Sequence, residues 1–405
     1  MTSLVTLDDV LDARELLAGL ARITPLEYSR HISLAVGGST WLKCENLQRA
    51  GTYKVRGAYV RIARLSAVER ARGVVAASAG NHAQGVALAA STLGTTSTVF
   101  MPTTAPLPKI SATKGYGATV ELVGTNVEEA LIAAQDFAER TGAVFIHPFD
   151  HPDVIAGQAT VALEIFDQCP EVQTIIAGIG GGGLISGIAV VAKALRSDVQ
   201  VIGVQARGAA AIPPSLIAGY PVRLSECNTI ADGIRVSRPG ELTFQHIAKL
   251  VDKVITVSDE DISRALLVLL ERHKLLTEPA GAVSVAGLMD GGATFDGPTV
   301  AVLSGGNIDP LLLLRVIEHG LAAAGRYRHF TVQCPDQPGQ LANLLRLIAN
   351  IGVNVLDVVH ERYDPRLALG QVTVSFSVET LGPEHFERMV AALRVSPFTL
   401  TTNEN

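Results

Sequence analysis

The stretch Thr174-Ile-Ile-Ala-Gly-Ile-Gly-Gly-Gly-Gly-Leu-Ile-Ser-Gly187 runs from an apolar, β-branched segment through consecutive glycines into a second apolar segment. Residues 174–177 predict a buried strand, and the glycines that follow open a helix. Backbone amides at a helix start bind phosphate, because their unpaired N–H groups and the helix dipole both favour an anion there. A phosphate-binding loop is therefore the first expectation, beside the alternative that the glycines only pack a turn.

The same glycines leave a nucleotide alternative open. Gly178, Gly180 and Gly183 satisfy G-x-G-x-x-G, the dinucleotide fingerprint. That motif calls for an acidic residue at the end of the next strand, where this chain has Gln205. Arg207 suits the 2′-phosphate of NADP, so an NADP-dependent enzyme is a minor alternative. No Lys-Ser/Thr pair follows the glycines, which excludes a nucleotide P-loop.

Strands and helices alternate along most of the chain. The predicted strands are residues 40–44, 73–77, 98–101, 118–122, 174–177, 199–204 and 299–303. Helices are expected from Asp8 to about Leu20, after Tyr53, from Asn81, near Pro106, near Asn126 and, with a capping-box-like start, from Ser258. Repeated strand–helix units favour an α/β fold whose parallel sheets are covered on both faces.

The pattern changes near residues 322–328. Beyond them the expected elements are a strand at 330–334, a helix at 340–350, strands at 355–363 and 371–378, a helix at 384–393 and a strand at 398–401. The two middle strands would form a hairpin about Asp364-Pro365. This order predicts a ferredoxin-like βαββαβ unit.

Composition bounds the class of protein. The 405 residues are 48% apolar and 18% charged, with a net charge of −6 and no basic stripe, which disfavours a nucleic-acid partner. Four scattered cysteines without a C-x-x-C pair indicate free thiols in a reducing compartment. The first residues do not form a signal peptide, and no window reaches the ~18 apolar residues of a membrane span. We expect a cytoplasmic protein that does not enter a membrane.

Lys54, in Gly51-Thr-Tyr-Lys-Val-Arg-Gly-Ala58, gains meaning from two loops elsewhere in the chain. A lysine by itself is usually a solvated surface charge. Here Ser78-Ala-Gly-Asn-His82 follows a strand and offers donors for a carboxylate, and the run from Gly180 offers a phosphate cradle. An amine able to form a Schiff base completes the equipment of a pyridoxal phosphate (PLP) enzyme.

Three further motifs are weaker. His82 is either a general base or a structural histidine, and the structural role is favoured because no neighbouring acid orients it. His147 and His151 have the i, i+4 spacing of metal ligands, but Pro148 interrupts a helix there. Ser304, in a Ser-Gly-Gly-Asn loop after a strand, can reach a ligand in a crevice at the strand ends.

Together these motifs resemble the fold-type-II PLP enzymes of tryptophan synthase β-like architecture, and specifically the threonine/serine dehydratase group. The tail from about Arg326 is similar to an ACT regulatory domain. The resemblance extends over essentially the whole chain. It implies a PLP-dependent catalytic domain over residues 1–322, built from two open parallel-sheet domains with a smaller one of about residues 45–150 inserted in the larger, and an ACT domain over residues 327–405.

The resemblance also implies roles for individual residues. Lys54 fits the Schiff-base lysine and catalytic base, Tyr53 replaces the usual phenylalanine beside it, and Ser304 fits the group at the pyridine nitrogen. The implied cofactor-binding residues are Lys54, Tyr53, Asn81, Gly180, Gly181, Gly182, Gly183, Leu184, Gly233, Glu278 and Ser304. The implied substrate-binding residues are Ser78, Ala79, Gly80, Asn81 and His82.

The implied activity is β-elimination on L-threonine, giving 2-oxobutyrate and ammonia, with L-serine as a weaker substrate. Serine racemases are similar but carry a second serine where this chain has Ala79, so racemisation is the disfavoured alternative. Some relatives bind a divalent cation through carboxylates after the strand that ends at Val204. The sequence Gln205-Ala-Arg-Gly-Ala-Ala210 offers none, so we expect no such metal.

The C-terminal part is expected to bind an amino-acid effector and to build a homo-oligomer, or else only to dimerise. By resemblance the effector loop is Asp336, Gln337, Pro338, Gly339, Gln340 and Leu341. A non-catalytic PLP-containing amino-acid sensor is the alternative from another class. The sequence leaves open threonine against serine or 3-hydroxyaspartate, because one methyl group discriminates by only ~1–3 kcal/mol. It also leaves open the effector, a biosynthetic (isoleucine) or catabolic role, and dimer against tetramer.

Overall fold

The computed structural model describes residues 3–290, 295, 297–323, 325–362 and 367–404. The chain forms two compact units, residues 1–309 and 310–405. Helix α14 (Pro310–Ala323) belongs to the second unit, whereas the sequence pattern predicts the boundary after that helix. Each unit is described by itself.

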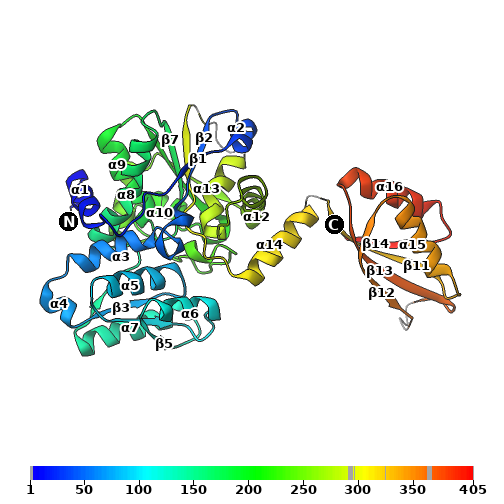
Figure 1. Ribbon diagram of the computed structural model, residues 1–405, viewed down its shortest axis with the longest axis horizontal. Coiled ribbons are helices and arrows are strands. Elements are labelled where there is room, and N and C mark those ends of the chain that lie inside the picture. Colours follow the sequence, from blue (N-terminus) through cyan, green and yellow to red (C-terminus); the bar gives the residue numbers. More distant parts are fainter. Residues whose placement is uncertain (1–2, 291–294, 296, 324, 363–366, 405) are drawn as a thin grey trace. The chain divides into compact units, whose positions relative to one another are not determined.

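The first unit contains a six-stranded sheet in the order β1-β2-β10-β7-β8-β9. Strands β1, β2 and β7 of this sheet are labelled in Figure 1. Its strands are β1 (Leu26–Tyr28), β2 (Thr40–Lys43), β7 (Thr174–Gly178), β8 (Gln200–Ala206), β9 (Lys253–Val257) and β10 (Thr299–Val302). All neighbours pair in parallel except β1 and β2. A parallel sheet needs cover on both faces, and helices pack against these strands from two layers.

A second sheet is formed by the segment between β2 and β7. It is fully parallel, in the order β5-β4-β3-β6. Its strands are β3 (Val74–Ala77), β4 (Ser97–Met101), β5 (Thr119–Leu122) and β6 (Val144–Phe145). Val74 and Ala76 of β3 pack with one core cluster, and Val75 and Ala77 with another, as expected of a strand buried on both faces.

The helices of the first unit connect and cover these strands. They are α1 (Leu7–Leu16), α2 (Arg30–Val36), α3 (Lys54–Ala63), α4 (Ala67–Ala71), α5 (Asn81–Thr92), α6 (Leu107–Gly115), α7 (Val127–Thr141), α8 (Pro152–Gln168), α9 (Gly183–Leu195), α10 (Ile212–Ala218), α11 (Glu241–Leu250), α12 (Asp259–Val268) and α13 (Pro279–Met289). Helix α9 packs on β7 and β8 and against α8 and α11. Helix α13 packs on β7 to β10 and against α2 and α12.

Most of the expected elements of this unit are confirmed within a residue or two. The capping box predicted before α12 is present, because Ser258 Oγ accepts from the Asp261 amide over 3.1 Å and the Asp261 carboxylate accepts from the Ser258 amide. The first helix is shorter than predicted. It ends at Leu16 rather than near Leu20, because a turn follows in which Gly19 has φ +81°.

Beyond α14, the second unit is a four-stranded antiparallel sheet in the order β12-β13-β11-β14 with two further helices. Its elements after α14 are β11 (Tyr327–Pro335), α15 (Gln340–Asn350), β12 (Asn354–Glu361), β13 (Gln371–Glu379), α16 (Pro383–Arg394) and β14 (Thr399–Glu404). This is the predicted βαββαβ topology. The expected hairpin turn at Asp364-Pro365 lies outside the described residues.

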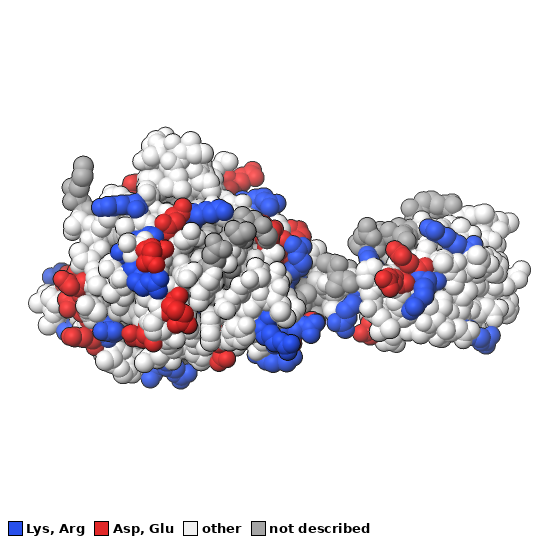
Figure 2. Space-filling view, turned by 90° about the horizontal axis from the view of Figure 1, so that it is seen from above, with Lys and Arg blue, Asp and Glu red and all other residues white. Residues whose placement is uncertain are grey.

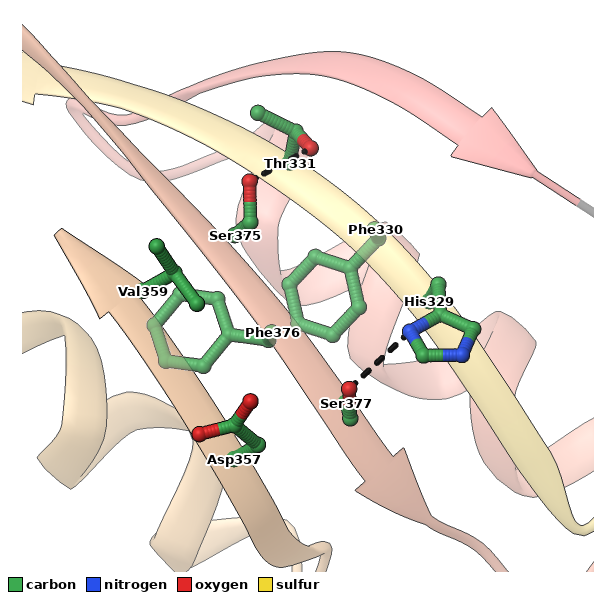
Figure 3. Close-up of a pocket in the computed structure, with 8 residues that line it drawn as sticks. All are labelled: His329, Phe330, Thr331, Asp357, Val359, Ser375, Phe376 and Ser377. Atoms are coloured by element: carbon green, nitrogen blue, oxygen red, sulfur yellow. Dashed lines mark hydrogen bonds between the residues drawn. The ribbon is translucent and has the colours of Figure 1, made fainter. Parts of the chain in front are cut away.

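Side chains of the second unit divide by sheet face. Phe330 and Phe376 stack with ring centroids 5.2 Å apart in the core beneath α15 and α16. Residues that alternate with them, such as Thr331 and Ser375, lie on the opposite face (Figure 3). The apolar face therefore holds the unit together, and the other face is polar.

The surface is mixed in charge. On the face drawn in Figure 2, Lys and Arg side chains are interspersed with Asp and Glu, and large uncharged areas lie between them. In the described part of the chain, no helix is both long and apolar enough to cross a membrane. All four cysteines are free thiols: Cys44, Cys169 and Cys334 are buried, and Cys227 is half-buried.

Candidate active site

The glycine loop (Gly180–Gly183) leaves the carboxyl end of β7 and becomes the first turn of α9. Gly182 has φ +100°, a conformation that side chains disfavour. A Cβ on Gly181 would overlap the ring of Phe149, so only glycine fits there. Thr243 Oγ1 donates to the Gly181 carbonyl over 2.7 Å and anchors the loop. The amides at this helix start have no partner within the helix and can bind an anion.

Lys54 lies at the start of α3, beside the glycine loop. Its Nζ donates to the Pro148 carbonyl over 3.0 Å, and the next residue, Phe149, is the one that contacts Gly181. Nζ also lies 5.4 Å from the centre of the Tyr53 ring. Burial lowers the pKa of Lys54 to about 8, although Glu278 opposes this shift. The amine is therefore neutral far more often than that of a solvated lysine.

The serine loop (Ser78–His82) leaves the carboxyl end of β3 and enters α5. Ser78 Oγ accepts from the Gly80 amide over 3.2 Å, which closes the turn. Gly85, one turn into α5, lets the helix approach α3: a Cβ there would stand 3.1 Å from the Lys54 backbone. The structure therefore brings the predicted carboxylate loop to the predicted lysine.

Asn81 connects this loop to the six-stranded sheet. Its Nδ2 donates to Glu278 Oε1, and its Oδ1 accepts from Asn307 Nδ2 over 2.9 Å. Gly233 and Gly305 adjoin the same carboxylate, since a Cβ on either would lie within 3.4 Å of Glu278 Oε1. The predicted residues Asn81, Gly233 and Glu278 thus share one site.

The Glu278 carboxyl is a buried acid with unusual titration. Burial raises its pKa to about 7, with a further contribution from Asp232, while Lys109 and Asn81 oppose the shift. Its loop approaches that of Ser304, because the Glu278 amide donates to the Gly305 carbonyl over 3.0 Å.

Ser304 lies between this acid and the lysine. Its Oγ donates to the Ala280 carbonyl over 3.1 Å, which ties the loop to the start of α13. Its carbonyl accepts from the Tyr53 amide, next to Lys54 in the chain. The loop after β10 therefore contacts both the lysine segment and the Glu278 segment.

His82 is structural, as the sequence favours. Its Nε2 donates to the Ile146 carbonyl over 2.8 Å, and the side chain is buried. Burial, with the nearby Lys54 charge, lowers its pKa to about 3. A ring with this pKa and an occupied nitrogen is a poor general base near neutral pH.

Gln205, which stands where a dinucleotide site needs an acid, is also structural. Its amide nitrogen donates to the Ile179 and Ala209 carbonyls, and its oxygen accepts from the Ile212 amide. Arg207 is exposed. These bonds use both N–H groups of the Gln205 amide and fix it in a structural role, which counts against the NADP alternative.

Sequence reasoning misses several residues of the site. Asn307 lies in the Ser304 loop, yet no motif assigns it the bond that it makes to Asn81. Pro148 and Phe149 enter the sequence analysis only as part of a poor metal motif. Lys109, on α6, forms an ion pair with Asp232 beside the site, and nothing in its local sequence distinguishes it from a surface lysine.

The predicted effector loop, Asp336–Leu341, connects β11 to α15. The Asp336 amide donates to the Gly370 carbonyl over 2.9 Å, and its carboxylate lies 3.5 Å from Arg362. A separate hollow of about 350 Å³ lies on the polar sheet face of the same unit (Figure 3). It is lined by His329, Phe330, Thr331, Asp357, Val359, Ser375, Phe376 and Ser377. No residue of the predicted loop lines this hollow.

The chain belongs to the pyridoxal-phosphate dependent enzyme family, whose model matches residues 17–305. Among known relatives, it is 44% identical to the L-threonine ammonia-lyase of Thermotoga maritima over 390 residues, 96% of this chain and 97% of the relative. Two solved structures are also similar. Threonine deaminase isoform 2 of Solanum lycopersicum has a TM-score of 0.73 and 35% identity, covering 78% of this chain and 95% of that one. Maize serine racemase has a TM-score of 0.75 and 35% identity, covering 79% and 99%.

The family match confirms the expected cofactor, and the residues around Lys54 fit it. PLP carries an aldehyde, a phosphate and a polar aromatic ring. The site offers a half-buried amine with a lowered pKa, a helix start without side chains, and the amide of Asn81. These groups come from three loops at strand ends, where ligands of α/β sheets bind.

Proposed function

We propose that the protein is a PLP-dependent L-threonine ammonia-lyase, which converts L-threonine to 2-oxobutyrate and ammonia. The observation that carries the proposal is the Lys54 amine, with its lowered pKa, beside the glycine loop in a chain matched over nearly its whole length by a threonine ammonia-lyase. L-Serine, giving pyruvate, is the weaker substrate.

Binding is the task of the loops. The amides of the glycine loop and the start of α9 hold the cofactor phosphate, with Leu184 in the first turn. The side-chain nitrogen of Asn81 is bonded to Glu278 and its oxygen to Asn307. The amide is therefore held rigidly where it can face the cofactor ring. Ser78, Ala79, Gly80, Asn81 and His82 form the turn that receives the substrate carboxylate. His82 contributes its backbone, since its ring is already bonded.

Proton transfer is the task of Lys54. Bound PLP supplies an electron sink for the charge left at the substrate Cα when its proton is removed. With a pKa of about 8, roughly a tenth of the Lys54 amine is neutral at pH 7, about three hundred times the fraction for an ordinary lysine. Lys54 therefore serves both as the covalent attachment point and as the base at Cα.

Ser304 sets the outcome of the reaction. Its hydroxyl carries no charge and donates to the Ala280 carbonyl, so it does not stabilise a proton on a pyridine nitrogen as a carboxylate would. Charge at Cα is then delocalised less, which favours prompt loss of the β-hydroxyl. Loss of water and hydrolysis of the resulting imine give the 2-oxo acid and ammonia.

Turnover of L-threonine by the full-length, PLP-saturated protein tests the proposal. We expect stoichiometric 2-oxobutyrate and ammonia from the wild type and a loss of at least about a thousandfold in K54A, because the base and the attachment point disappear together. Borohydride should fix the cofactor to a peptide containing Lys54. Cofactor fixed there without 2-oxobutyrate would favour the amino-acid sensor instead.

Serine racemisation is the second candidate, because maize serine racemase is among the similar structures. Ala79 argues against it, since a methyl group cannot deliver a proton to the second face of Cα. Incubation with L-serine should give pyruvate faster than D-serine, and A79S should raise D-serine formation. D-Serine accumulating faster than pyruvate in the wild type would contradict our assignment.

For the second unit we propose an ACT-type regulatory role, with an amino-acid effector at Asp336–Leu341 and assembly into a homo-oligomer. The ferredoxin-like topology and the exposed loop before α15 support this proposal. Branched-chain amino acids are the first compounds to add to the threonine assay. D336A should remove their effect, and S377A in the sheet hollow is the matched control. If S377A removed the effect and D336A did not, the effector site would be the hollow on the sheet face instead.

A further inference from the structure

An ion pair beside the active site connects the parts of the first unit that hold its two sheets. Lys109, on α6, donates to Asp232, in the short 3₁₀ turn Asp232–Ile234. The Lys109 side chain is only 10% exposed and that of Asp232 is 41% exposed. Helix α6 packs on α5 next to the four-stranded sheet, whereas the 3₁₀ turn packs on α13 next to the six-stranded sheet.

The pair lies directly against the groups that form the site. A Cβ on Gly80, in the serine loop, would stand 3.7 Å from Lys109 Nζ. On the other side, Gly233 follows Asp232 and adjoins both Ala280 and Glu278. Lys109 Nζ therefore lies close to the loop that follows β3, and Asp232 precedes a residue that adjoins the Glu278 segment of the six-stranded sheet.

We propose that Lys109 and Asp232 are positioning residues, whose ion pair holds the serine loop at a fixed distance from the Glu278 side of the active site. The inference rests on the proposed function for its substrate. The Lys109 side chain is nearly buried, so water cannot easily replace Asp232 as the partner of its ammonium group. Breaking the ion pair would therefore leave a largely buried charge without compensation. The pair is thus buried at Lys109, on the side of the serine loop, and exposed only at Asp232.

A double-mutant cycle tests the pair in the PLP-loaded, full-length enzyme. The variants are K109M, D232N and the double variant K109M/D232N, with K114M as the control, because Lys114 is exposed on the same helix. We expect each single change to lower kcat/KM for L-threonine by roughly tenfold, mostly because KM rises. The kcat/KM of the double variant should be no lower than that of the less active single variant. K114M should behave as the wild type.

Amide hydrogen exchange gives a readout that needs no turnover. In K109M and D232N, peptides covering residues 78–92 and 107–115 should exchange faster than in the wild type and K114M, and the double variant should exchange no faster than either single variant. Cofactor absorbance should be unchanged in all variants.

Two results would overturn the proposal. The first is that amide hydrogens in both single variants exchange at the wild-type rate. The second is that the losses of kcat/KM in the two single variants multiply in the double variant. If the wild type itself made no 2-oxobutyrate, the proposed function would fail, but the exchange comparison would still decide the role of the pair.

Discussion

Lys54 and Glu278 depart from their ordinary acid–base behaviour for one reason, which is that burial penalises the charged form of each. The pKa of the lysine falls to about 8 and that of the glutamic acid rises to about 7. Both groups therefore titrate close to neutral pH. This suits Lys54 as a base and Glu278 as a polar neighbour of the cofactor ring. His82 serves in neither role, because its ring donates a hydrogen bond to the Ile146 carbonyl.

Glu278 predicts a pH dependence of stability. Its folded pKa lies above its unfolded value, so folding is favoured while the group is protonated in both states. That contribution is lost as pH rises from about 4.5 to about 7. In the cofactor-free protein, E278Q should therefore gain about 1–3 kcal/mol relative to wild type at pH 8 and little at pH 5. Urea unfolding at the two pH values measures the difference, and an equal gain at both would refute this assignment.

At the scale of elements, the crossing of α3 and α8 holds Lys54 in place. A Cβ on Gly157 would stand 2.6 Å from the Gly57 Cα and 2.7 Å from the Arg56 carbonyl, so the two backbones touch. Beside the crossing lies a buried charge cluster (Lys43, Glu45, Arg56 and Glu164), in which two cations balance two anions. The helix that begins with Lys54 is thus fixed by contact on one side and by charge on another.

Enlarging the contact should be costly. We expect G157A to destabilise the protein by about 1–3 kcal/mol, because the added methyl group must push two backbones apart. G115A, in α6, is the matched control: its Cβ would meet nothing within 4 Å, so it should be neutral or slightly stabilising. Chemical denaturation of both variants gives the comparison.

Removing the central cation of the charge cluster should cost more. Arg56 forms two bonds of 2.8 Å to Glu45 and lies 2.7 Å from Glu164. R56M leaves two buried carboxylates with one cation, and a loss of about 3–5 kcal/mol is expected. R14M breaks an ion pair exposed on both sides and should cost less than about 1 kcal/mol. Similar losses in the two variants would show that the cluster is not coupled as described.

At the scale of the whole molecule, each unit has its own core, so each should respond to its own mutations. In the second unit, Phe376 is buried in the stack with Phe330. F376A should cost that unit about 3–5 kcal/mol. In calorimetry one transition should shift while cofactor absorbance, which reports the first unit, stays constant. Parallel loss of both signals would mean that the units unfold together.

Local sequence patterns predict the chemistry of this chain better than its packing. Strands with β-branched residues and loops rich in glycine are evident from the sequence, because their pattern is local. Helices α8 and α13 are not predicted. In α13 every residue from Pro279 to Leu288 is buried, so no amphipathic period remains to mark the helix. Lys109 and Asn307 depend on contacts made far along the chain, which local patterns do not record.

Cys227 gives the chain a natural handle for spectroscopy. It is the half-buried thiol of the four, and it lies five residues before Asp232 in the same irregular segment. Because burial raises its thiol pKa, a maleimide dye should attach slowly at neutral pH and faster in alkaline buffer. A fluorophore at this position, introduced without any engineered cysteine, would follow in real time how the segment responds when an amino acid enters.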